Sequence, residues 1–196
     1  MSTRDRILDG AAEVMRIRGL ANTTTKEIAK AAGLSEAMLY KVFRDKVDLF
    51  LGVLSERLPR MTVLSGTADG HLERNTLADV RQLASEVLSF YLESFPIAAS
   101  LFSDPQLLAR HREALLERDA GPQTVIEGVA AHLTAQQRAG RMAPTAPAEV
   151  VAELLVGACL HRAFLVCFSG EVATPDHIAG FAADVVNALE PVLNAS

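Results

Sequence analysis

The sequence predicts an all-α protein, and three observations support this prediction. Apolar residues recur three and four positions apart in nearly every segment, which is the period of one helix face. Gly, Pro, Asp, Ser and Thr interrupt these runs at about one helix length, where they can cap or end a helix. The sequence contains no strand-like alternation of apolar and polar residues and no internal repeat. We therefore expect about nine helices and no sheet.

Four helices are predicted in the N-terminal part of the chain. Apolar residues from Ile7 to Met15 share the face of the first helix, and hydroxyl or carboxylate side chains precede the next three. The first helix should end at Gly19, the second should run from Thr24 or Thr25 to Ala32, the third should cover residues 35–43, and the fourth should run from Asp45 to before Pro59.

The remaining helices are predicted from the same signals. Asp104-Pro105 is a strong start, because it places a cap before a proline at the first helical position. The expected elements are a helix from Leu77 up to Pro96, a short helix over 96–102, helices over 105–120 and 122–139, and two long helices that open at 145–147 and 174–176. Residues 65–75 have the composition of a linker or a helix–helix loop.

Residues 25–44 predict two short helices that cross at close range. Ala29 is small where the second helix passes over it. Gly33 follows the first helix, where the backbone commonly needs a positive φ. Ser35 can accept a hydrogen bond from the first free N–H groups of the second helix. This pattern describes a helix-turn-helix, which presents its second helix to the major groove of DNA.

The charge is distributed unevenly along the chain. Residues 1–57 hold ten Lys and Arg against eight Asp and Glu, a net charge of +2, whereas residues 58–196 hold nine against sixteen, a net charge of −7. The two parts together give the net charge of −5 of the whole chain. Only the N-terminal part is therefore suited to a polyanion, although its excess of positive charge is small.

Neither a leader nor a membrane span is expected. Charges fall within the first six residues, and Glu153, His161 and Arg162 interrupt the most apolar stretch, Val150 to Phe168. The two cysteines, Cys159 and Cys167, lie two turns apart on this stretch and are expected to be buried thiols in a reducing compartment. We expect a cytoplasmic protein.

The last two helices predict a second copy of the chain as a partner. Residues 150–168 are apolar on nearly every side, so one face can serve the chain's own core and the other needs another surface. A homodimer built on paired helices is the simplest explanation, with a thick single-chain core as the alternative. The residues expected at the dimer interface are Val156, Leu160, Phe181, Val185 and Leu189.

The N-terminal segment resembles the TetR family of transcriptional regulators. The residues that carry the resemblance are Arg6 to Ala12, Gly19, Thr23 to Ala29, Ala32 to Ser35, Leu39, Tyr40, Phe43, Lys46 and Leu49. They span about fifty residues, and the rest of the chain matches in architecture only. The resemblance implies a DNA-binding domain over 1–58 and an effector-binding and dimerisation domain over 59–196.

The resemblance also implies contacts with a palindromic operator in double-stranded DNA. If Leu39, Val42 and Phe43 turn into the core, helical spacing places the opposite face toward the groove. Tyr40 matches a family tyrosine that usually touches a phosphate or a thymine methyl group. The expected DNA-binding residues are Thr25, Lys26, Ser35, Glu36, Ala37, Met38, Tyr40, Lys41, Arg44 and Lys46.

Three positions depart from the usual pattern of the family. Glu36 and Met38 stand where many members carry a polar, often basic residue and a Ser or Thr, and Val42 replaces a frequent aromatic residue or histidine. Glu36 can accept from a cytosine amino group or simply favour the helix N-terminus. The operator sequence is therefore not predicted.

In this family the C-terminal domain usually binds a small molecule, which implies a repressor released from DNA by an effector. Few acidic residues occur in these segments, so a mostly apolar effector is expected rather than a cationic one. The residues expected to bind it are Phe90, Tyr91, Phe95, Phe102, Leu108, His111, His132, His161, Phe164 and Phe168.

Two other functions remain as alternatives. One is a dimeric DNA-binding protein without a ligand, which a solid core would favour. The other is a helical enzyme, but the sequence shows no phosphate-binding glycine loop, metal-ligand cluster or nucleophile elbow, and His111 with Glu113 is too weak a pair. We expect no catalytic residue, metal or cofactor.

Overall fold

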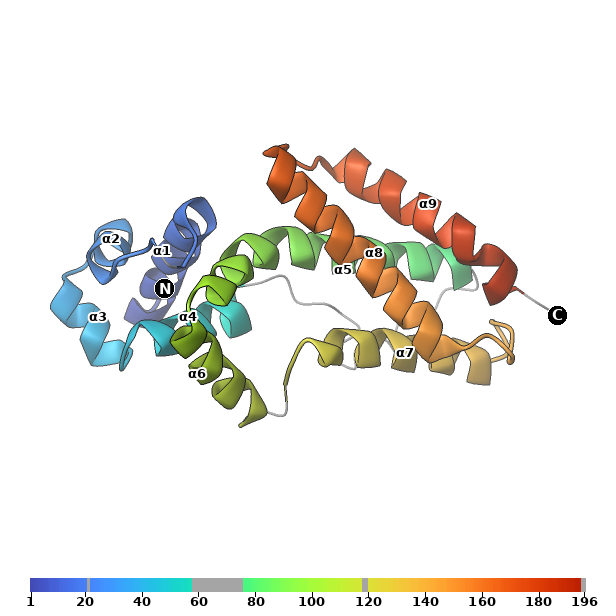
Figure 1. Cartoon of the computed structure of the whole chain (residues 1–196), viewed down its shortest axis with the longest axis horizontal. Coiled ribbons are helices and arrows are strands. Elements are labelled where there is room, and N and C mark those ends of the chain that lie inside the picture. Colours follow the sequence, from blue (N-terminus) through green and yellow to red (C-terminus); the bar gives the residue numbers. More distant parts are fainter. Residues whose placement is uncertain (21, 58–75, 118–119, 195–196) are drawn as a thin grey trace. The chain divides into compact units, whose positions relative to one another are not determined.

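The computed structural model describes residues 1–20, 22–57, 76–117 and 120–194. Within these ranges the chain forms nine α-helices and one 3₁₀ helix, with no strand, which confirms the predicted fold class (Figure 1). The elements are α1 (Thr3–Arg18), α2 (Thr25–Ala31), α3 (Glu36–Val42), α4 (Lys46–Glu56), α5 (Thr76–Ala98), the 3₁₀ helix η3 (Ala99–Ser103), α6 (Pro105–Leu116), α7 (Gln123–Arg138), α8 (Ala148–Ser169) and α9 (Pro175–Leu193).

The chain divides into two compact units. The first consists of Met1–Leu58 and Glu93–Gly121, and the second consists of Pro59–Leu92 and Pro122–Ser196. Residues 93–121 therefore belong to the first unit by their contacts, and the boundary falls inside α5. The functional division expected after residue 58 remains a prediction.

Side-chain caps fix the starts of the N-terminal helices. The Ser2 hydroxyl accepts from the Asp5 N–H, and the Asp5 carboxylate accepts from the Ser2 N–H, so both form a capping box. Thr24 and Glu27 make the same arrangement at the start of α2. The Asp45 carboxylate accepts from the first free N–H groups of α4. These local hydrogen bonds explain why the helix starts were readable from the sequence.

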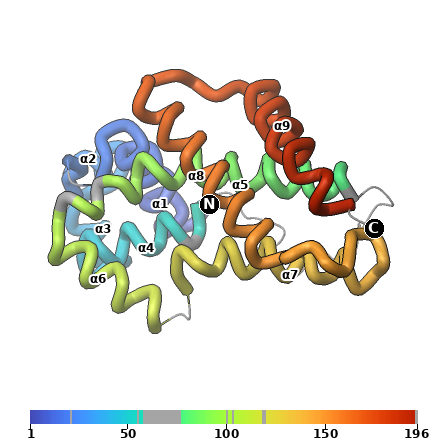
Figure 2. Tube along the Cα trace, turned by 45° about the vertical axis from the view of Figure 1, so that its right-hand side comes forward, coloured from blue at the N-terminus to red at the C-terminus, as the bar shows by residue number. Residues whose placement is uncertain are grey.

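The core of the first unit lies where α1, α2, α3 and α4 meet (Figure 2). Its fully buried side chains include Leu8, Ile28, Leu39 and Phe50. Arg57 donates to the carboxylates of Asp5 at 2.8 Å and Asp9 at 2.6 Å, and so links the end of α4 to α1. Helix α6 belongs to the same unit, where Arg110 donates to Asp45 at 2.5 Å.

The core of the second unit is formed by α5, α7, α8 and α9. One face of α8, which includes Leu155, Cys159 and Ala163, is fully buried in it. Cys159 donates a weak hydrogen bond to the Ala84 carbonyl at 3.6 Å, and burial raises the pKa of its thiol to about 12. Both cysteines are free thiols, and Cys167 is only partly buried.

Two predicted elements differ from the structure. Helix α5 continues through Pro96 to Ala98, and a 3₁₀ helix follows it. Pro96 lies in the last turn of α5 and removes one backbone donor there. Because the helix ends two residues later, this loss does not break it in the middle. Helix α6 ends at Leu116, earlier than expected. The predicted loop at 65–75 lies outside the described residues.

Among the residues that the structure describes, α8 alone is long and apolar enough, by length and composition, to cross a bilayer. A helix that packs in a protein core passes the same test, and one face of α8 is buried against α5 and α7. The apolar composition of α8 is therefore weak evidence for a membrane span.

Two partly buried histidines predict a loss of stability at mildly acidic pH. His111 packs on the Phe50 ring with centroids 5.3 Å apart, and His132 lies on α7. Burial lowers the pKa of each below the ordinary value of 6.5. Since the unfolded chain then binds more protons than the folded chain, the free energy of unfolding falls as the pH drops below about 6.5.

Thermal unfolding at pH 7.5 and pH 5.5 measures this effect. The melting temperature should fall by a few degrees, and the fall should shrink in a His111→Phe, His132→Phe double variant. Asp5, whose pKa is held low by hydrogen bonds from Ser2 and Arg57, contributes only at more acidic pH. An equal fall in the double variant would show that other groups are responsible.

Candidate nucleic-acid interface

The turn between α2 and α3 is held by a side chain from α1. The Arg6 guanidinium donates to the carbonyls of Ala32 at 2.9 Å and Gly33 at 3.0 Å. Gly33 has a φ of +64°, and the Leu34 N–H donates to the Ala29 carbonyl at 2.9 Å. Arg6 therefore satisfies carbonyls at the end of α2 and fixes the angle at which α3 begins.

Helix α3 turns one face to the core and the other to solvent. Leu39 is buried together with Phe43, the residue that caps the helix, and Val42 is half-buried against them. Every residue expected on the opposite face is exposed: Ala37, Tyr40, Lys41 and Arg44. Ser35 caps α3 by accepting from the Met38 N–H at 3.3 Å. The orientation matches the one expected from helical spacing, and contact with DNA remains a prediction.

Three of the predicted DNA-binding side chains form a chain of hydrogen bonds on this surface. The Tyr40 hydroxyl donates to the Thr25 hydroxyl oxygen at 3.3 Å, and the Thr25 hydroxyl donates to the Glu36 carboxylate. The first residue of α2 is thereby joined to the first residue of α3. These bonds restrain the side chains of Tyr40 and Glu36 before any DNA is bound, which lowers the entropy lost on binding.

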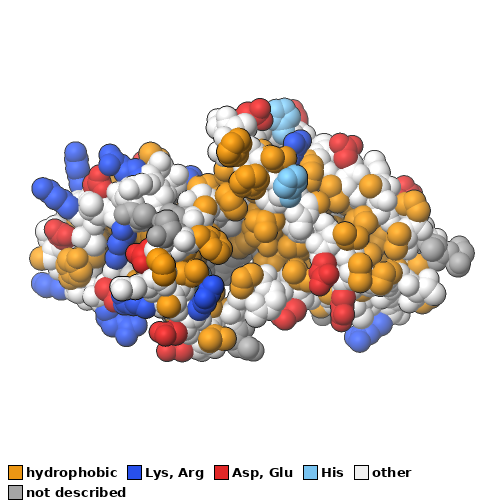
Figure 3. Space-filling view, in the orientation of Figure 1, with side chains coloured by type: hydrophobic (Ala, Val, Ile, Leu, Met, Phe, Trp, Pro, Cys, Tyr) orange, Lys and Arg blue, Asp and Glu red, His pale blue; other side chains and the backbone are white. Residues whose placement is uncertain are grey.

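Positive charges surround the exposed face of α3 (Figure 3). Lys26 and Lys41 are exposed, whereas Arg44 lies 3.8 Å from the Asp48 carboxylate. Lys46, at the start of α4, is partly buried, and burial lowers its pKa against the opposing effect of nearby Asp104 and Glu27. These groups can neutralise phosphates, which is the sequence-independent part of DNA binding.

Sequence reasoning missed two residues of this surface. Lys30 is exposed one helical turn after Lys26, and both border an open groove of about 680 Å³ that Leu34 and Glu36 also line. The spacing of the two lysines was the available signal, because residues four apart lie on one helix face. The role of Arg6 could not be read from spacing, since its partners are 26 and 27 positions away.

The residues expected to bind an effector are divided between the two units. Four of them, Phe95, Phe102, Leu108 and His111, belong to the first unit, and the other six belong to the second: Phe90, Tyr91, His132, His161, Phe164 and Phe168. Phe102 is 75% exposed and Phe168 is 81% exposed. Aromatic content alone cannot show which way a side chain points. The second unit has a cavity of about 170 Å³, and none of the ten residues lines it.

Of the residues expected at a dimer interface, one is buried and the others keep exposed surface. Val156 is 3% exposed and packs in the core, so the prediction of this residue at a subunit surface was wrong. Phe181, Val185 and Leu189 are half-buried against the same core. Leu160 is exposed, beside an exposed apolar stripe on α8 that consists of Val150, Leu154, Phe164, Leu165 and Phe168. Because α8 is apolar on nearly all sides, its sequence gave no signal for which side faces outward.

Residues 7–53 match the family model of bacterial regulatory proteins of the tetR family. The HTH-type transcriptional regulator YvkB of Bacillus subtilis is 35% identical over 75 residues, which are 38% of this chain and 40% of YvkB. The HTH-type transcriptional regulator AcrR of Shigella flexneri is 46% identical over 48 residues, 24% of this chain and 22% of AcrR. The chain thus spans less than half the length of these curated relatives.

Solved structures share the fold over nearly the whole chain. A TetR-family transcriptional regulator from Mesorhizobium loti superposes with a TM-score of 0.75 at 20% identity and covers 98% of this chain and 97% of its own. FadR of Bacillus subtilis, solved in complex with stearoyl-CoA, gives a TM-score of 0.68 at 14% identity and covers 98% of both chains.

In the part of the chain that the structure describes, no group of three or more His, Cys, Asp or Glu side chains can hold a metal ion.

Proposed function

We propose that this chain is a sequence-specific DNA-binding regulator of transcription of the TetR family, because residues 7–53 match the model of that family and similar regulators match part of the chain. The observation that carries this proposal is the exposed face of α3, the second helix of the helix-turn-helix, where Tyr40 and Lys41 are exposed, as is Arg44 just after the helix. An exposed helix that carries basic side chains suits the major groove. We place the protein in the cytoplasm and assign it no catalytic role.

We further propose that the protein acts as a homodimer. The exposed stripe on α8 gives a second copy an apolar surface, and the two-fold axis would present two recognition helices to a palindromic operator. Such helices reach successive major grooves when they are about 34–36 Å apart. A ligand that favours another spacing would weaken DNA binding by shifting the population of dimers, which is how we propose that repression is released.

The cavity of about 170 Å³ supports a small effector. An engineered apolar cavity of about 150 Å³ in another protein holds benzene, which sets the scale. FadR, with the same fold, was solved with a much larger ligand, stearoyl-CoA. The volume of the cavity in this chain fits a compact molecule.

DNA binding tests the proposal directly. A duplex enriched by the wild-type protein from a random-sequence pool serves as the probe. We expect Tyr40→Ala and Lys46→Ala each to weaken binding by about tenfold or more, because each removes a contact with phosphate or base. Lys46→Ala should also reduce the slope of log affinity against log salt concentration by about one.

Two measurements make the result interpretable. Arg138→Ala, on the exposed side of α7 in the second unit, removes a positive charge elsewhere and should leave the affinity unchanged. The melting temperature shows whether the interface variants remain folded. Folded variants that bind the duplex as tightly as the wild type would overturn the assignment of this surface.

A further inference from the structure

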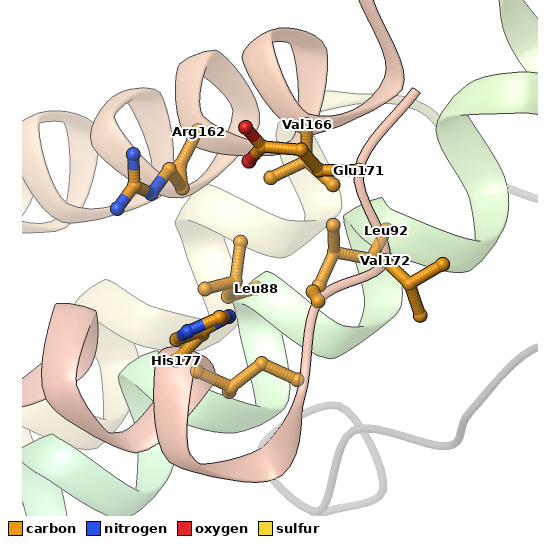
Figure 4. Close-up of a pocket in the computed structure, with 9 residues that line it drawn as sticks. Leu88, Leu92, Arg162, Val166, Glu171, Val172 and His177 are labelled. Carbon is orange, nitrogen blue, oxygen red and sulfur yellow. The ribbon is translucent and has the colours of Figure 1, made fainter. Parts of the chain in front are cut away.

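A cavity in the second unit lies where α5, the end of α8, the connection after it and the start of α9 meet (Figure 4). Its volume is about 170 Å³. Leu88 and Leu92 from α5, Val166 from α8 and Ile178 from α9 give it an apolar lining. None of these side chains belongs to the proposed DNA-binding surface, so the cavity has no part in the contacts described above.

Charged side chains of both signs border this apolar space. Arg162 comes from α8 and Glu171 from the connection that follows, and Figure 4 shows His177 across the cavity from them with Leu88 between. Within the described ranges, no ion pair within 4.0 Å involves Arg162 or Glu171. Arg162 lines the cavity, and its guanidinium also lies 5.3 Å from the centre of the Phe181 ring on α9.

The pair of opposite charges restricts the chemistry of a ligand. A simple carboxylate could pair with Arg162 but would meet the negative charge of Glu171 at the same wall. A simple amine would meet the opposite problem at Arg162. A molecule that carries both charges satisfies both residues, since each partner favours the charged form of the other.

We propose that this cavity binds a small zwitterion with a branched apolar side chain, of the class of the aliphatic α-amino acids. The carboxylate pairs with Arg162, whose planar guanidinium suits a two-oxygen acceptor. The ammonium group pairs with Glu171, and the side chain packs on Leu88, Leu92 and Ile178. A cavity of this volume accepts a branched chain of a few carbon atoms.

Binding to the full chain tests the assignment without DNA. The probes are L-leucine, 4-methylpentanoate, which lacks the ammonium group, and 3-methylbutylamine, which lacks the carboxylate. Isothermal titration calorimetry should show that leucine binds about ten- to a hundredfold more tightly than either analogue, since each analogue loses one charge-assisted contact. Chemical-shift changes should centre on residues 162–178. Equal affinity of leucine and one analogue, or shifts elsewhere, would overturn the proposal.

Variants separate the two charged contacts. Arg162→Met should weaken leucine binding about tenfold or more and strengthen binding of the amine, which no longer meets a like charge. Glu171→Gln should weaken leucine binding and strengthen binding of the carboxylate for the same reason. The controls Arg138→Met and Glu127→Gln remove the same charges from the exposed side of α7 and should change none of the affinities. Sedimentation of each variant checks that its oligomeric state is unaltered. If both cavity variants bind leucine as the wild type does, Arg162 and Glu171 do not form the site.

The proposal that this ligand regulates DNA binding rests on the proposed function. The proposal that the cavity binds the ligand does not. Affinity for the enriched duplex is measured separately, with and without leucine at saturation. If the interface variants bind the duplex as tightly as the wild type, the leucine titrations still test the cavity. If leucine does not bind, the proposed DNA-binding surface is unaffected. The two proposals therefore stand or fall on different measurements.

Discussion

Replacing Gly10 with Val is expected to destabilise the first unit by on the order of 3 kcal/mol and to abolish DNA binding. A Cβ atom at Gly10 would lie 2.8 Å from the backbone nitrogen of Ala32 and 3.2 Å from the carbonyl carbon of Ala31. These are backbone atoms at the end of α2, so they cannot rotate away as a flexible side chain can. The helix-turn-helix depends on this approach of α1 to α2, because Arg6 on α1 also holds the turn.

The matched control for this change lies on the same helix. Glu13→Val introduces the same side chain on the solvent side of α1 and should cost less than about 1 kcal/mol, which reflects helix propensity alone. Chemical denaturation gives the free energy of unfolding of both variants, and titration with the enriched duplex gives their affinity. Similar stability of the two variants would show that α1 can move away from α2, contrary to the packing described.

Replacing Leu154 with Glu is expected to separate the proposed dimer. Leu154 is 58% exposed on the outer stripe of α8 and makes no part of the chain's own buried core. In a two-fold dimer the change would place an unpaired carboxylate in an apolar interface on each subunit, which costs several kcal/mol. The dimer dissociation constant should rise by about a thousandfold or more. Affinity for a palindromic duplex should fall with it, because one recognition helix then binds alone.

Analytical ultracentrifugation measures the mass of the wild type and the variant. Ala135→Glu adds the same charge on the exposed side of α7 and should leave the dimer intact. A cooperative melting transition should show that Leu154→Glu is still folded, since the position is exposed in a single chain. A wild-type protein that sediments as a monomer, or a variant that keeps the dimer mass, would refute this interface.

The helix-turn-helix could be predicted from sequence because its signals are local. Thr24, Ser35 and Asp45 each cap a helix that starts at the next residue, and Gly33 supplies the positive φ between α2 and α3. Each of these requirements involves residues within a few positions of one another. The exposed face of α3 followed from the same short-range geometry, because Leu39 and Phe43 set the inward direction.

The cavity that we propose as an effector site could not be predicted in the same way. The cavity joins Leu88 on α5 to Ile178 on α9, ninety positions along the chain, and the ten residues proposed from composition lie in both units. Aromatic and histidine side chains indicate which residues a ligand can contact only after their directions are known. The sequence carries the residue types, and the packing of distant helices decides which of them face a common space.

The sequence by itself determined the all-α class, the helix starts and the solvent-exposed side of α3, because hydrogen bonds and periodicity over a few residues decide them. The tertiary structure alone decided the side of α8 that faces outward, the packing of 93–121 with the first unit and the position of the cavity. On a helix that is apolar on nearly every side, the spacing of the apolar residues does not indicate which side faces the core. Val156 was therefore expected at a surface, although contacts with distant helices turn it into the core and leave Leu154 exposed.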